Sequence, residues 1–137
     1  MPNPSTAPHR RPRWLYALAL IAIVFGVMTV ISGGGVLFGP RAARVAAGYY
    51  VPYVVWFNFL AGFAYVLAGI GIWIGARWAT WLSAFILVTT MAVGVVFGVH
   101  VAAGGEYESR TVGALIFRIA VWATVVMALR HTAKRSA

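Results

Sequence analysis

Residues 50–102 read YVPYVVWFNFLAGFAYVLAGIGIWIGARWATWLSAFILVTTMAVGVVFGVHVA, and Arg77 is the one charged residue among them. A helix needs about 20 mostly apolar residues to cross a bilayer, so this stretch is long enough for two crossings. The polar interruption around Arg77 is so short that the chain can only turn back on itself there. The segment therefore predicts two membrane-spanning helices, over 50–75 and 78–102, joined as a tight hairpin.

Two further apolar runs flank this hairpin. Residues 14–40 contain no charged side chain, and residues 111–129 contain one, Arg118. Spanning β-strands would alternate apolar and polar residues, and these runs do not alternate. We therefore expect two more spanning helices, over 14–37 and 111–131.

The composition agrees with a membrane protein. Of the 137 residues, 62% are hydrophobic and 9% are charged, whereas soluble domains are roughly 45–50% apolar and about 25% charged. The chain has no cysteine, which excludes disulfides, thiol redox centres and cysteine zinc sites. The expected fold class is all-α, an integral membrane four-helix antiparallel bundle with residues 14–131 as its single domain.

The two ends of the chain are basic. We expect residues 1–13, rich in proline and arginine, to form a disordered leader, and residues 132–137 to form a short basic tail. An even number of spans places both ends on one side of the membrane, and lysine and arginine mark the cytoplasmic side. Seven positive residues fall on the side of the termini and three on the other: Arg10, Arg11, Arg13, Arg77, Arg130, Lys134 and Arg135 against Arg41, Arg44 and Arg110. We therefore expect cytoplasmic termini, and the bias towards alanine, valine, glycine and arginine suggests a bacterial plasma (inner) membrane.

Polar residues gather in or near the outer half of the predicted bundle. A charged residue inside a span is costly and usually meets a partner, and Arg118 is the clearest case. We expect an outward-facing ligand pocket or polar cluster with Arg118 at its floor. Alternatively, Arg118 reaches the outer interface or forms a structural bridge with Glu106 or Glu108. The members of the cluster are Asn58, His100, Glu106, Glu108, Arg110 and Arg118.

Small residues spaced four apart predict where the helices pack, because close approach replaces apolar burial as the main attraction in lipid. The contacts could lie within one bundle or between two copies of the chain. The predicted contact residues are Ala64 with Ala68, Gly71 with Gly75, Gly94 with Gly98, and Ala120 with Thr124 and Ala128.

Three functions are compatible with these features. The chain shows no nucleotide-binding loop and no nucleophile paired with a base, so we expect a non-enzymatic role. The first hypothesis is an accessory or scaffold subunit of a larger membrane complex. The second is a small dimeric transporter or channel for a polar or anionic solute that uses Arg118. The third is a metal or quinone site that uses His100, Glu106 and Glu108.

The expected partners follow from the membrane setting. The basic ends would contact the bilayer and its anionic headgroups. A partner membrane protein or a second copy of the chain would cover the helix faces. Nucleic acid is not expected, because the positive residues are divided between short ends and loops and form no basic face. The sequence implies no cofactor.

Overall fold

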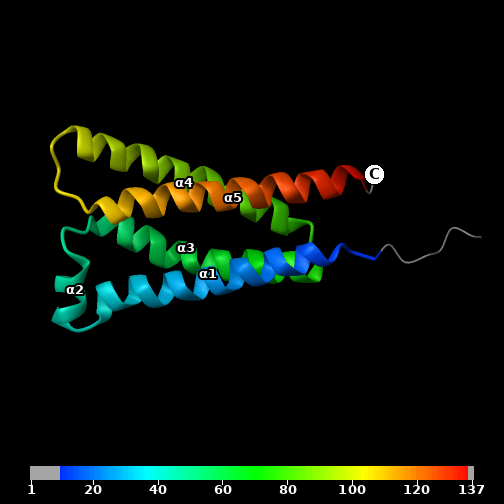
Figure 1. Cartoon of the computed structure of the whole chain (residues 1–137), viewed down its shortest axis with the longest axis horizontal. Coiled ribbons are helices and arrows are strands. Elements are labelled where there is room, and N and C mark those ends of the chain that lie inside the picture. Colours follow the sequence, from blue (N-terminus) through cyan, green and yellow to red (C-terminus); the bar gives the residue numbers. More distant parts are fainter. Residues whose placement is uncertain (1–9, 136–137) are drawn as a thin grey trace, which may run out of the picture.

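The computed structural model describes residues 10–135, and within that range it contains helices and no strands (Figure 1). The all-α prediction is confirmed for these residues. The four long helices are each long and apolar enough to cross a membrane, which supports a multi-pass membrane protein. The helices are α1 (Arg13–Phe38), α2 (Arg41–Ala47), α3 (Pro52–Ile74), α4 (Trp78–Ala102) and α5 (Ser109–Arg135).

The long helices begin and end within four residues of the predicted ranges. The differences lie at the ends of the chain and in the first link. Helix α5 continues to Arg135, so residues 132–135 are helical where a tail was expected. Residues 1–9 of the predicted leader and residues 136–137 lie outside the described residues. The first link contains the seven-residue helix α2, which has no buried residue.

Proline and glycine fix the ends of α3. Pro52 stands in the first turn of α3. The N–H groups of the first turn have no partner within a helix, so proline, which has no N–H, costs no hydrogen bond there. At the other end, Gly75 adopts a positive φ of 76°, a left-handed conformation that commonly ends helices and that glycine accepts without strain. This cap permits the tight turn from α3 into α4.

Helices α1 and α3 form the closest contact in the molecule. The buried residues of α1 are alternately four and three apart, from Leu15 through to Gly33, which is the spacing of coiled-coil contacts. A Cβ added to Gly26 would lie 2.7 Å from the carbonyl oxygen of Gly62, and one added to Gly69 would lie 2.9 Å from the carbonyl oxygen of Ala19. The two backbones therefore touch, and rising residue numbers in α1 meet falling numbers in α3. We call Gly26, Gly33, Gly62 and Gly69 the glycine seam.

The predicted small-residue contacts of α4 and α5 are not made within the described chain. A Cβ at Gly98 would have nothing within 4 Å, and one at Gly94 would only reach ordinary contact with Ile119 at 3.8 Å. Ala120 and Thr124 are exposed. Helices α3 and α4 also approach closely at the predicted contact residue Gly71, where an added Cβ would lie 2.9 Å from the Cβ of Ala79 and 2.7 Å from the Trp78 ring.

The core contains side chains from all four long helices. At its centre the ring of Tyr65 lies 5.5 Å from Phe25 and 4.9 Å from Trp122. Helices α1 and α5 are not among the closely packed pairs. They meet instead through the rings of Phe25 and Phe117, whose centroids are 5.7 Å apart. Towards the end of the molecule that carries α2, this separation leaves a cavity.

Candidate functional site

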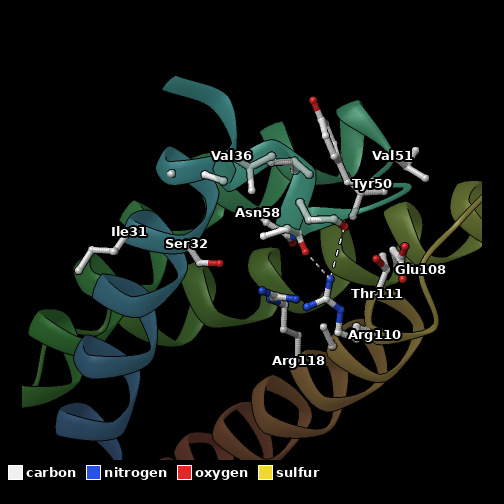
Figure 2. Close-up of a pocket in the computed structure, with 17 residues that line it drawn as sticks. Ile31, Ser32, Val36, Tyr50, Val51, Asn58, Glu108, Arg110, Thr111 and Arg118 are labelled. Carbon is white, nitrogen blue, oxygen red and sulfur yellow. Dashed lines mark hydrogen bonds between the residues drawn. The ribbon is translucent and has the colours of Figure 1, made fainter. Parts of the chain in front are cut away.

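The cavity has a volume of about 500 Å³ and lies between α1, α3 and α5, beside α2. Helix α2, which lines it, is at the end of the molecule opposite to the start of α1 and the end of α5 (Figure 1). Figure 2 shows Arg118 of α5 extending towards residues of α1 and α3, whereas Arg110 of α5 bonds to α2. Four of the six predicted site residues line this cavity: Asn58, Glu108, Arg110 and Arg118.

Arg118 extends into the cavity from α5 (Figure 2). Its guanidinium carbon lies 5.8 Å from the centroid of the Phe25 ring, and its Nε is buried without a hydrogen-bond partner among residues 10–135. The nearby group that acts on its charge is the phenol of Tyr65, and neither Glu106 nor Glu108 forms an ion pair with it in the described chain. The structural bridge considered from the sequence is therefore absent there, and the charge of Arg118 faces the cavity.

Asn58 lines the cavity from α3. Its Oδ1 is buried and has no hydrogen-bond partner within the described part of the chain. A buried polar atom left without a partner costs roughly 1–3 kcal/mol. Asn58 and Arg118, the residues that carry this acceptor and the unpartnered Nε donor, both line the cavity. A ligand that offers both an anionic oxygen and a hydroxyl group matches these two side chains.

Arg110 and Glu108 hold α2 beside the cavity. Arg110 donates to the carbonyl oxygens of Ala46 and Ala47, at 3.1 and 3.5 Å (Figure 2). These carbonyls end α2, where a positive charge is favourable. The Oε1 of Glu108 accepts the backbone N–H of Tyr49 at 3.0 Å. We call α2 and these two contacts the roof of the cavity.

His100 and Glu106 do not line this cavity. The Nε2 of His100 lies 3.1 Å from the carbonyl oxygen of Glu106, and the imidazole ring packs beside Tyr53 and Phe97. The side chain of Glu106 is exposed. Among residues 10–135 no group of three histidine, cysteine, aspartate or glutamate side chains is arranged to hold a metal ion. The predicted metal-site residues therefore have other neighbours, and the polar cluster is smaller than expected.

The sequence reasoning did not include the residues beneath Arg118. The Tyr65 hydroxyl and the Trp122 Nε1 are fully buried, and neither makes a hydrogen bond of standard geometry in the described chain. The hydroxyl nevertheless lies near Thr90 and Arg118. Tyr65 follows Asn58 by seven residues and so shares its helical face, and this spacing is the signal for it in the sequence.

The cavity is chemically suited to an oxyanion. It holds two guanidinium groups and one carboxylate, and that carboxylate already binds a backbone N–H. Each guanidinium has five N–H donors in a planar fork that matches phosphate and carboxylate. Arg110 uses part of this capacity on α2, whereas Arg118 has a neighbouring ring and no carboxylate. The excess of donors and positive charge favours an anionic group.

Comparison with family models, with curated proteins and with solved structures yields no match, so the function of this chain must be argued from its own residues.

Proposed function

We propose that the four long helices form an antiparallel bundle across the bacterial plasma membrane, with both termini in the cytoplasm. The apolar length of the helices and the seven-to-three distribution of positive residues support this placement. In this orientation α2 and the cavity lie on the outer side. The basic residues near the termini then lie at the level of the cytoplasmic headgroups.

We propose that the protein is non-enzymatic and binds an anionic group in the cavity. The observation that carries this proposal is Arg118, whose charged side chain belongs to the apolar helix α5 and has no carboxylate partner among residues 10–135. Inserting such a charge into a membrane costs about 2.5–3.5 kcal/mol by insertion measurements. An anion in the cavity would offset that cost, and a transporter of an anionic solute would use the same contact.

Thermal unfolding of the detergent-purified protein tests the proposal. The probes are inorganic phosphate, sulfate and decyl phosphate, and the proteins are the wild type, Arg118→Gln and the control Arg77→Gln. Arg77 is exposed at the opposite end of the molecule. A probe at tenfold excess over its Kd stabilises the folded state by about 1.4 kcal/mol.

We expect at least one probe to stabilise the wild type and Arg77→Gln but not Arg118→Gln. If no probe stabilises the wild type, the proposal fails. If Arg118→Gln is stabilised as much as the wild type, the anion binds elsewhere and the assigned site is wrong.

A second function, an accessory subunit that docks on one helix of a partner membrane protein, is favoured by a groove between α4 and α5. This groove has a volume of about 490 Å³ and is lined almost wholly by apolar residues. Space beside Gly98 is open, so another helix could approach there as closely as α1 approaches α3. Gly98→Leu would then abolish co-purification of the partner. A native gel that shows free monomer for the wild type would contradict this second function.

A further inference from the structure

We infer that the occupant of the cavity is a membrane lipid with an anionic phosphate-ester headgroup, which enters sideways between α1 and α5. This inference rests on the proposed function, because it names the class of ligand for the same site. Three features carry it: the side on which the cavity opens, the depth of its polar groups, and the chemistry of its unpartnered atoms.

The roof covers the cavity at the end of the molecule, and apolar side chains border it laterally, between α1 and α5. Ala43, Ala46 and Ala47 of α2 line it from the end of the molecule. Between α1 and α5 the helices do not pack closely, and Ile31 lines the cavity while 66% exposed. Because acyl chains surround a spanning helix at this level, the gap between α1 and α5 opens towards lipid.

The side chains that border this gap on the side away from α2 are apolar as well. Met28 lies one turn from Ile31 on α1 and is 61% exposed, and Phe117 of α5 is 57% exposed. The contact between Phe25 and Phe117 closes the gap beneath the cavity. A lipid whose headgroup lies in the cavity could therefore keep its acyl chains against apolar side chains and remain in its leaflet.

The polar groups lie at the depth that a headgroup reaches. The Cα of Arg118 is about 13 Å along α5 from Ser109, and that of Asn58 is about 9 Å along α3 from Pro52, at 1.5 Å per residue. Long side chains of a helix lean towards its N-terminus. The guanidinium of Arg118 consequently lies closer to the outer end than its Cα does, near Asn58 and Arg110 (Figure 2).

The unpartnered atoms select the headgroup. The arginines favour a phosphate oxygen, and the carboxamide of Asn58, which lines the cavity with them, favours a ligand that carries a hydroxyl group. A phosphoglycerol headgroup offers both groups. A choline headgroup would add a positive charge beside two guanidinium groups and offers no hydroxyl, so we infer a preference for the anionic lipid.

The test is native mass spectrometry together with thermal unfolding of the full chain. The probes are phosphatidylglycerol, phosphatidylcholine and inorganic phosphate. The variants are Arg118→Gln, the matched control Arg77→Gln, and Ile31→Trp. Because Ile31 is exposed, a tryptophan there narrows the lateral opening without removing a charge or filling the core.

We expect the wild type and Arg77→Gln to bind one phosphatidylglycerol at least about tenfold more tightly than phosphatidylcholine. Arg118→Gln should lose this preference. Ile31→Trp should weaken lipid binding while leaving any response to inorganic phosphate unchanged, and this variant keeps the test decisive if Arg118→Gln does not fold.

Other outcomes separate the two proposals. If inorganic phosphate stabilises the wild type and no lipid is retained, the cavity binds a free anion and the lipid inference is overturned. If Arg77→Gln loses phosphatidylglycerol as strongly as Arg118→Gln, the lipid binds to basic surfaces in general, which also overturns it. If no lipid binds and neither phosphate, sulfate nor decyl phosphate stabilises the wild type, the proposed function fails together with the inference.

Discussion

Asn58 and Arg118 reach one cavity from α3 and α5, and each contributes a buried polar atom, Oδ1 and Nε, that has no hydrogen-bond partner in residues 10–135. Each unmade bond costs roughly 1–3 kcal/mol. A purely structural pair would be expected to bond, since a guanidinium donor and an amide acceptor are complementary. The arrangement therefore lowers the stability of the empty protein and leaves two of the residues that line the cavity with an unmade hydrogen bond.

Arg118→Leu should make the empty protein more stable. Without lipid or anion, we expect the free energy of unfolding to rise by about 1–3 kcal/mol, because the variant removes an unpaired charge from an apolar setting. Unfolding of the delipidated protein in a detergent series measures this. Arg130→Leu, at an exposed position, serves as control and should change stability by no more than about 0.5 kcal/mol. Marked destabilisation by Arg118→Leu would show that the arginine is structural.

Gly26→Ala should destabilise the protein by about 1–3 kcal/mol, the usual range for overpacking. The new Cβ would lie 2.7 Å from the carbonyl oxygen of Gly62 and 2.8 Å from the backbone nitrogen of Val66, so the backbones of α1 and α3 would have to separate. Gly98→Ala is the matched control, since that Cβ meets nothing within 4 Å. Thermal unfolding measures both variants. Equal effects would contradict the glycine seam.

Arg11→Ala should cost about 1 kcal/mol, because a charged donor would be removed from the end of α3. Arg11 donates to the carbonyl oxygens of Trp73 and Ile72 at 2.9 and 3.0 Å. The Ile72 carbonyl also accepts the N–H of Gly75 at 3.2 Å, whereas the Trp73 carbonyl lies in the last turn, where carbonyls lack a helical partner. Arg13→Ala provides the control, as Arg13 is exposed at the start of α1. Hydrogen exchange at the last turn of α3 should rise in the first variant and not in the second.

The orientation can be tested because the chain contains no cysteine, so a single introduced thiol is the one label site. We expect a membrane-impermeant maleimide to label Ser109→Cys in spheroplasts without permeabilisation. Ala133→Cys should be labelled after permeabilisation. Both positions are exposed. The reverse pattern would place the cavity in the cytoplasm and would overturn the proposed topology.

The sequence predicted the four long helices because apolar length and freedom from charge are properties of a single segment. Of the glycines that bring helices together, the predicted small-residue contacts included Gly71 of α3 but not the glycine seam. Gly26 and Gly33 are seven apart, as are Gly62 and Gly69, whereas the prediction considered pairs four apart. That spacing is visible in the sequence, but which helix lies opposite depends on the whole arrangement and not on either segment alone.

The site was predicted in part for the same reason. Helical phase and distance from the loops placed Asn58 and Arg118 at a common level, and the structure brings both to one cavity with Arg110. His100 lies instead beside the rings of Tyr53 and Phe97. The sequence near His100 does not indicate where its side chain points, because this depends on the path of the loop after α4, whose Glu106 carbonyl lies beside the imidazole. The ligand-binding role of the cluster stays a prediction.

The glycine seam also bears on how the chain is made. Synthesis proceeds from the N-terminus, so α1 and α3 can close against each other before α5 leaves the ribosome. When α5 is added, Phe25 of α1 and the α3 residues Asn58 and Tyr65 would already lie in an assembled pair of helices. Arg118 would then meet these three side chains. The long helix that carries a charged residue inside its apolar run would thus be delivered last, beside groups that can shelter that charge.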